Sequence, residues 1–185
     1  MNVFWREEPL NEDEARLLQL CFTAHAQSAL RQNVSTAVLV EASRANGGDY
    51  TKALMAALCT LGGIHAPLMD TWRVLSTSDV EHLKFAIKSG ILVPGWGSSF
   101  AKEDEEIWGP VEAHLKEHNS EIWSRVESIT DLLKEKNLRP NPSTFTAAVG
   151  IALKMPPQML PWIFITGRLN TWTTLFLETT MKGGK

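Results

Sequence analysis

The sequence lacks the features that mark membrane-spanning, secreted and metal-binding proteins. No apolar run approaches the roughly 20 residues that a membrane-spanning helix requires. The start, MNVFWREEPLNEDEAR, is acidic and has no basic region followed by the apolar stretch of a signal peptide. No HExxH, paired CxxC, acidic calcium loop, P-loop or dinucleotide glycine fingerprint occurs. We therefore expect no membrane partner, no metal and no resident cofactor.

Cysteine and clustered basic residues are also scarce. The two cysteines, Cys21 and Cys59, lie in apolar stretches predicted to be helical, where buried thiols are far commoner than disulfides or metal ligands. The 18 basic residues are outnumbered by 21 acidic ones, whereas surfaces for nucleic acids or anionic membranes need clustered lysine and arginine. These counts predict a cytoplasmic protein with no nucleic-acid partner.

Period-two alternation is missing as well, so the sequence predicts an all-α fold without a sheet. At 185 residues and 44% hydrophobic content, the chain can form one domain with a real core. Asn11 and Asp49 are predicted N-caps. Helices are predicted over residues 12–26, 34–45, 50–61, from about 67, 77–88, 105–136 with a division at 119–120, 143–155 and 157–178. The helix at 34–45 should be buried, and that at 50–61 packed on most sides.

Two residues have side chains that call for a partner. His65 follows a double glycine at a predicted helix end and precedes Ala66-Pro67, so its imidazole would face the mouth between two helices; a structural histidine remains the alternative. Arg168 lies in PWIFITGRLNTW, which is apolar on both sides. An unpaired buried charge is costly, so Arg168 must either join an internal salt bridge or bind an anion. The residues alone leave both choices open.

Three segments, taken in order, resemble the citrate synthase superfamily, including its short citryl-CoA lyase members. The first is NVSTAVLVEASRANGGDYTKALMAALCTLGGIHAP, similar to a family stretch that ends near an LHGG motif. The second is VPGWGSSFAK, inside the one conspicuous irregular segment, and is similar to VPGFGHRVYK of the family. The third is RPNPSTFTAAVGIALKMPPQMLPWIFITGRLNTW. Together they cover most of residues 11–178.

The resemblance implies an all-helical homodimer with its active site in a cleft between a large and a small domain. Such enzymes condense acetyl-CoA with oxaloacetate, or cleave citryl-CoA, without a metal. On this basis we expect residues 1–185 to form a single citrate-synthase-like domain that is truncated at its N-terminus relative to the family. Residues from about 68 to 140 would resemble the small CoA-side subdomain. An acyl-CoA or an organic acid would be the ligand.

Some family site residues are kept in this sequence. The resemblance makes His65 the histidine that polarises the thioester carbonyl, and Arg168 an arginine that binds a carboxylate. His25 corresponds to a substrate-binding histidine if a few residues are inserted before residue 33. The frame of the CoA-side loop is kept by Pro94, Gly95, Gly97 and Lys102.

Other family site residues are replaced. Ser98 stands where the family has a histidine that binds the oxo-acid, and Ser143 stands where it has the general-base aspartate. Losing a general base costs roughly 10²- to 10⁴-fold in rate. Three functions remain open: a binding or regulatory homodimer with a degenerate site, an active enzyme with altered acyl-CoA chemistry that uses His65, and an interaction module with a vestigial pocket.

Overall fold

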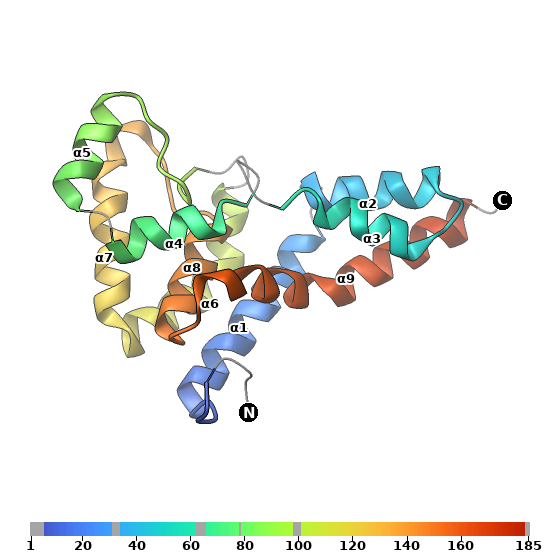
Figure 1. The fold of residues 1–185 in the computed structure, drawn as a ribbon, viewed down its shortest axis with the longest axis horizontal. Helices are drawn as coiled ribbons and strands as arrows, with labels where there is room; N and C mark the ends of the chain where they lie inside the picture. Colours follow the sequence, from blue (N-terminus) through green and yellow to red (C-terminus); the bar gives the residue numbers. More distant parts are fainter. Residues whose placement is uncertain (1–5, 31–33, 62–65, 78, 98–100, 184–185) are drawn as a thin grey trace.

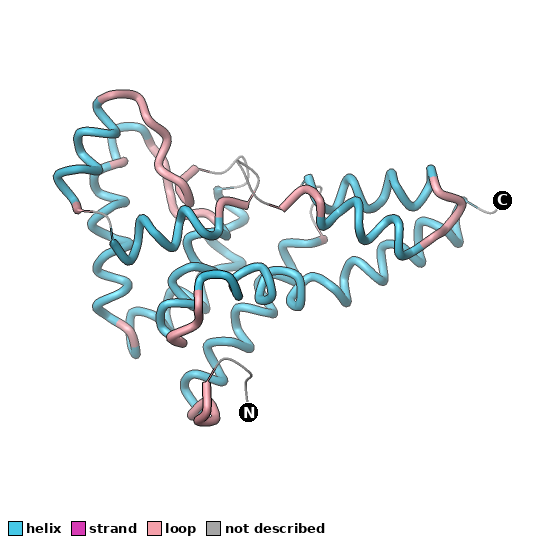
Figure 2. Tube along the Cα trace, in the orientation of Figure 1, coloured by secondary structure: helices cyan, strands magenta, loops and turns pink. Residues whose placement is uncertain are grey.

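The computed structural model describes five stretches of the chain and shows an all-α fold in them. These stretches contain nine α-helices and no strand, and their only β-type pairing is an isolated antiparallel bridge between Trp96 and Pro140. Figure 2 shows helices joined by short loops throughout the described part of the chain. The expected fold class is confirmed. The described residues are 6–30, 34–61, 66–77, 79–97 and 101–183, with the backbone alone for 101–105 and 182–183.

Helix α1 (Glu12–Ala29) begins at the predicted N-cap. The Asn11 side chain accepts a hydrogen bond from the backbone N–H of Glu14, and the Glu14 carboxylate accepts one from the backbone N–H of Asn11, each at 2.9 Å. This reciprocal pair satisfies two N–H groups that a helix start otherwise leaves without partners. Glu14 is also tied to Arg6, with 2.7 Å between Oε1 and Nη1.

Helices α2 (Val34–Ala45) and α3 (Tyr50–Leu58) form a projecting arm with the second half of the long helix α9 (Leu160–Gly183), as Figure 1 shows. The predicted cap of α3 is confirmed, because the Asp49 side chain accepts from the backbone N–H of Lys52. The predictions that α2 is buried and that α3 is packed on most sides are wrong.

Burial in the arm is confined to one face of each helix. In α3 only Ala53 and Ala57 are buried, and Met55 is 60% exposed. The reason is that α3 packs mainly on α2 and α9 among the described elements, which leaves much of its outer face exposed. Cys59, at the C-terminal cap of α3, is therefore exposed, contrary to expectation, whereas Cys21 in α1 is buried and its thiol pKa is raised by burial.

The other end of the molecule is built from α4 (Leu68–Thr77), α5 (Val80–Lys88), α6 (Ala101–His118) and α7 (Ser120–Leu132) (Figure 1). Asn119 separates α6 from α7, so the predicted division of the long amphipathic stretch is confirmed. These helices lie within the segment expected to resemble the CoA-side subdomain. That domain division stays a prediction.

Helix α8 (Pro142–Ala152) lies at the centre, and every residue from 143 to 150 is buried. It packs against α1, α4, α6, α7 and α9. Helices α1 and α9 cross closely because Gly167 has no side chain: a Cβ there would lie 2.6 Å from the Cβ of His25 and 3.2 Å from the Cα of Phe22. This crossing brings His25 next to the helix that carries Arg168. No described helix is long and apolar enough to span a membrane.

Candidate functional site

The predicted CoA-side loop lies against the start of α8. The backbone N–H of Gly97 donates to the carbonyl of Arg139 at 2.8 Å, and the N–H of Asn141 donates to the carbonyl of Gly95 at 2.9 Å. The indole N–H of Trp96 donates to Thr130 Oγ1 on α7 at 2.9 Å. The segment from Val93 to Gly97 is therefore held on two sides, although it has no regular structure of its own.

Asn141 joins this loop to the helix through its side chain. Its Oδ1 accepts from the backbone N–H of Ser143, and its Nδ2 donates to the carbonyl of Gly97, both at 2.9 Å. An asparagine followed by proline at the first helical position is a strong helix-start combination. One side chain thus fixes the first turn of α8 and the position of the loop together.

Gly95 must be glycine at this junction. Its φ is +92°, a region that residues with a Cβ rarely adopt. A Cβ there would lie 2.4 Å from Thr71 Cγ2 and 2.6 Å from Thr144 Oγ1, and the Thr144 hydroxyl donates to the Gly95 carbonyl. The loop backbone therefore fits directly between α4 and α8. The structure brings Gly95 and Gly97 to the start of α8, where Ser143 lies.

Ser143 lies in the first turn of α8 and is 6% exposed. The first turn of this helix contains no acidic residue, and Thr144 beside Ser143 already donates its hydroxyl to the loop. A neutral hydroxyl cannot take a proton from a carbon acid near neutral pH, whereas a carboxylate at the same place can. The local chemistry at the start of α8 therefore offers hydrogen bonds and no proton acceptor of useful basicity.

His25 is fully buried and points from α1 to α8. Its Nε2 lies 2.9 Å from Thr146 Oγ1, and that hydroxyl donates its own proton to the carbonyl of Pro142 at 2.7 Å. The Thr146 oxygen must therefore accept, so Nε2 carries the proton and Nδ1 is the unprotonated nitrogen. The ring packs edge-on to Trp108 and Phe164, with centroids 4.9 and 5.0 Å away.

The environment keeps His25 neutral. Burial, and secondarily the positive charge of Arg168, lower the pKa of His25 well below its ordinary value of 6.5. A charged imidazole would have to lose its hydration without gaining a counter-ion here. Its Nδ1 has no hydrogen-bond partner among the described residues. His25 can therefore accept a hydrogen bond from a ligand but does not supply a positive charge.

Arg168 supplies the positive charge of this region. It is 4% exposed, its Nη2 donates to Ser28 Oγ at 3.3 Å, and its guanidinium carbon lies 4.0 Å from the centre of the Phe164 ring. A guanidinium over an aromatic face is stabilised by the ring quadrupole. These contacts do not decide between an internal salt bridge and an anion site, so both alternatives from the sequence remain.

Helix α8 brings the two groups of residues together. Ser143, beside the loop, and Thr146, bonded to His25, are three positions apart and so lie on one side of the helix. The predicted site residues His65 and Ser98 fall outside the described residues, and for Lys102 only the backbone, in α6, is described. Their proposed roles stay predictions. Within the part of the chain that is described, no cluster of His, Cys, Asp or Glu has metal-site geometry.

Sequence reasoning missed three residues that build this region. Asn141 could have been found, because asparagine before proline signals a helix start. Thr146 and Trp108 gave no such signal, since a threonine and a tryptophan on helical faces are ordinary core residues. Their contacts with His25 depend on how α1, α6 and α8 pack.

Comparisons with known proteins decide the family. The model of the family described as citrate synthase, C-terminal domain, matches residues 2–185. The chain belongs to the citrate synthase family. This family member is also similar to the solved structure of citryl-CoA lyase from Hydrogenobacter thermophilus, with a TM-score of 0.71 and 17% identity; the match covers 94% of this chain and 72% of the other. At that identity the likeness shows the fold alone. A search of curated proteins finds no significant match.

The pH dependence of stability tests the neutral state of His25 in this family member. Below pH 6.5 the unfolded chain binds a proton on this residue that the folded chain, with its lowered pKa, does not bind. The free energy of unfolding therefore keeps its full value above the pKa that His25 has in the unfolded chain. It falls as the pH drops toward the lower pKa that His25 has in the folded chain. For one proton, the free energy of unfolding changes by about 1.4 kcal/mol per pH unit. Urea unfolding between about pH 7.5 and pH 5 measures it.

The control is a pair of histidine variants. His25→Gln should lower the slope of unfolding free energy against pH by the amount expected for one proton. His82→Gln, at an exposed position on α5, should leave this slope unchanged. Because slopes are compared, a general loss of stability in His25→Gln does not obscure the result. Equal slopes in the wild type and His25→Gln would show that His25 does not resist protonation in the fold.

Proposed function

We propose that this citrate synthase family member is a binding or regulatory homodimer that recognises an acyl-CoA or an organic acid and does not turn it over efficiently. The observation that carries the proposal is Ser143 in the first turn of α8, a turn that has no acidic residue. By the resemblance this is the place of the general base. A hydroxyl replaces the carboxylate there.

Loss of this base should lower the rate of the reaction that the family resemblance implies by a large factor. The α-proton of a thioester is weakly acidic, so enolisation needs a positioned base as well as stabilisation of the enolate oxygen. Without the base the rate falls by roughly 10²- to 10⁴-fold. The replacement at Ser98 removes a substrate-orienting group as well, which costs further orders of magnitude.

The binding part of the proposal is supported by groups that the chain keeps. Arg168 carries a permanent charge, and His25 beside it is neutral with one bare nitrogen. The carboxylate of a ligand can therefore pair with the cation, and a hydroxyl of the same ligand can donate to the bare nitrogen. Arg168 is 4% exposed. A carboxylate therefore reaches it only after the covering segments move. Binding should be slow and should stabilise the fold.

Thermal unfolding with added CoA, acetyl-CoA, citrate and oxaloacetate tests ligand recognition. A ligand at about 100 times its dissociation constant stabilises the folded state by about 2.7 kcal/mol. For a chain of this size that corresponds to a rise in Tm of about 5–10 °C. We expect such a rise with at least one of the four compounds.

Two matched variants assign the effect to the site. Arg168→Lys keeps the charge but loses the planar fork that binds a carboxylate, so the rise with an organic acid should disappear. Arg16→Lys, at an exposed position on α1, should retain it. If none of the four compounds raises Tm, the proposal is contradicted. The protein is then better described as an interaction module with a vestigial pocket.

The homodimer is supported by the arm. The helices at 33–45 and 50–61 correspond, by the resemblance, to family helices that pack across a two-fold axis. The arm exposes large apolar side chains to solvent: Val34 is 43% exposed, Met55 60%, Leu177 51% and Met181 78%. Several exposed apolar side chains on one projecting arm are typical of a region that a second subunit covers.

Sedimentation equilibrium tests the dimer. We expect a mass of twice the 20.6 kDa of the chain. Met55→Lys should weaken the dimer at least tenfold, because it places a charge in an apolar interface. Phe85→Lys, which changes an apolar residue of similar exposure on α5 away from the arm, should leave the dimer unchanged. A wild-type protein that remains monomeric across the concentration range contradicts the dimer.

A further inference from the structure

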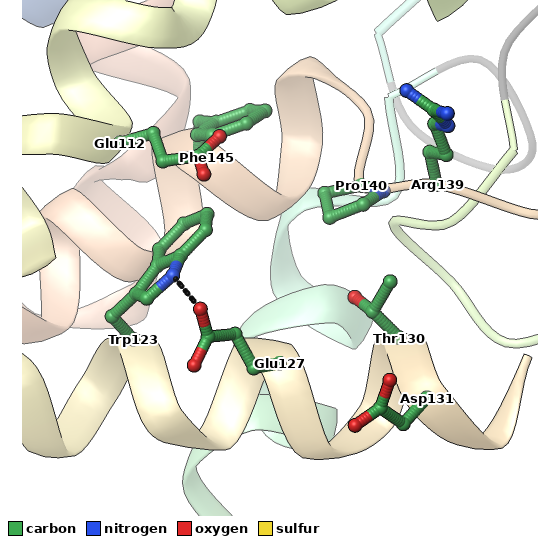
Figure 3. Close-up of a pocket in the computed structure, with 8 residues that line it drawn as sticks. All are labelled: Glu112, Trp123, Glu127, Thr130, Asp131, Arg139, Pro140 and Phe145. Atoms are coloured by element: carbon green, nitrogen blue, oxygen red, sulfur yellow. Dashed lines mark hydrogen bonds between the residues drawn. The ribbon is translucent and has the colours of Figure 1, made fainter. Parts of the chain in front are cut away.

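A pocket of about 480 Å³ lies along α7, where this helix faces the start of α8. We call it the α7 pocket. Figure 3 shows Trp123, Glu127, Thr130 and Asp131 along α7 on one side and Pro140 and Phe145 across from them. Its volume falls in the range of small-molecule sites.

One wall of the α7 pocket, formed by Trp123 and Phe145, is aromatic, and we call it the aromatic wall. Trp123 and Phe145 stack with their centroids 5.9 Å apart and their planes at 23°, and Phe145 stacks on Trp108 at 5.2 Å and 13°. The indole N–H of Trp123 donates to Glu127 Oε1 at 2.8 Å, which fixes this carboxylate beside the ring (Figure 3). A preformed wall of this kind loses little conformational entropy when a ligand binds.

The charges around the α7 pocket are mainly negative. The described residues that line it include three carboxylates, those of Glu112, Glu127 and Asp131, against one basic side chain, that of Arg139. In Figure 3 Arg139 lies at the opposite end of the pocket from Trp123. The part of the pocket next to the aromatic wall is therefore suited to a cation.

Lys116 shows that this wall accepts an ammonium group. Its Nζ lies 2.7 Å from Glu112 Oε1, 3.8 Å from Glu127 Oε1 and 5.5 Å from the centre of the Trp123 ring. Carboxylates and an aromatic face together are the usual surroundings of a bound ammonium or guanidinium. The chain itself thus places a cation against two of the three carboxylates.

Asp131 remains for an external ligand. It is exposed and makes no ion pair or side-chain hydrogen bond with any residue that the structure describes. It lies one helical turn from Glu127, on the same side of α7. A cation between these two carboxylates would have its stem against Pro140 and Phe145.

We propose that the α7 pocket binds a small organic cation, a primary ammonium or guanidinium group on an apolar stem. The proposal does not depend on the function assigned to the Ser143 region. Helix α8 turns by about 200° between Ser143 and Phe145, so the two residues face nearly opposite sides of the helix.

Calorimetric titration with three probes that share one stem tests the proposal. The probes are 2-phenylethylamine, which is cationic, 2-phenylethanol, which is neutral, and 3-phenylpropionate, which is anionic. We expect the amine to bind at least about tenfold more tightly than the other two, and its affinity to fall several-fold when salt is raised, because screening weakens the exposed charges. Equal affinities for all three probes, or no binding of the amine below about 10 mM, overturn the proposal.

Two pairs of variants locate the amine in the pocket. Asp131→Asn should weaken binding about 3- to 10-fold, whereas Glu121→Gln, which removes the same charge from α7 outside the pocket, should change it less than about twofold. Lys116→Gln removes the internal competitor and should tighten binding about 3- to 10-fold, whereas Lys134→Gln, also outside the pocket, should not. An amine affinity that responds equally to both members of either pair contradicts the assignment.

Discussion

The arrangement of the candidate site depends on the hydrogen bonds of Asn141. Its backbone N–H donates to Gly95, its Nδ2 donates to Gly97, and its Oδ1 accepts from the N–H of Ser143. Each bond satisfies a polar group that would otherwise lose its hydration in a largely buried region. The loop has no internal ladder to define its course, so these bonds determine where it lies. The site is assembled on the first turn of α8.

Burial at the centre determines the electrostatics of the site. The imidazole of His25 is neutral and bonded to Thr146, while Arg168 beside it lies over Phe164 and keeps its charge. Arg168 therefore contributes a positive charge and His25 an uncharged hydrogen-bonding group. Enolisation of a thioester needs a basic carboxylate in addition, and the first turn of α8 has none. This missing carboxylate is the basis of the proposal that the site holds a ligand and does not remove its proton efficiently.

The helices could be predicted from local sequence, since caps and breakers act over a few residues. Asn11 and Asp49 begin helices as expected, and Asn119 divides the long charged stretch. Burial could not be predicted in the same way. The low charge of α3 suggested a helix packed on most sides, but Met55 and Cys59 are exposed because α3 packs mainly on α2 and α9 among the described elements.

The candidate site was only partly accessible to sequence reasoning. The resemblance pointed to Gly95, Gly97 and Ser143, and the structure brings them together. The contact between His25 and Thr146 joins residues 121 positions apart, and no local pattern specifies such a contact. The α7 pocket was missed for the same reason, since its walls come from three helices and the chain just before α8.

The most direct test of the central claim is proton exchange at the methyl group of acetyl-CoA. The protein is incubated with acetyl-CoA and oxaloacetate in deuterated water, and methyl deuteration is followed by mass spectrometry. Because a hydroxyl stands where a carboxylate is needed, we expect exchange no faster than in protein-free solution, both for the wild type and for Ser143→Ala. Exchange by the wild type at about 1 s⁻¹ or faster, an ordinary enzymatic rate, would contradict the account.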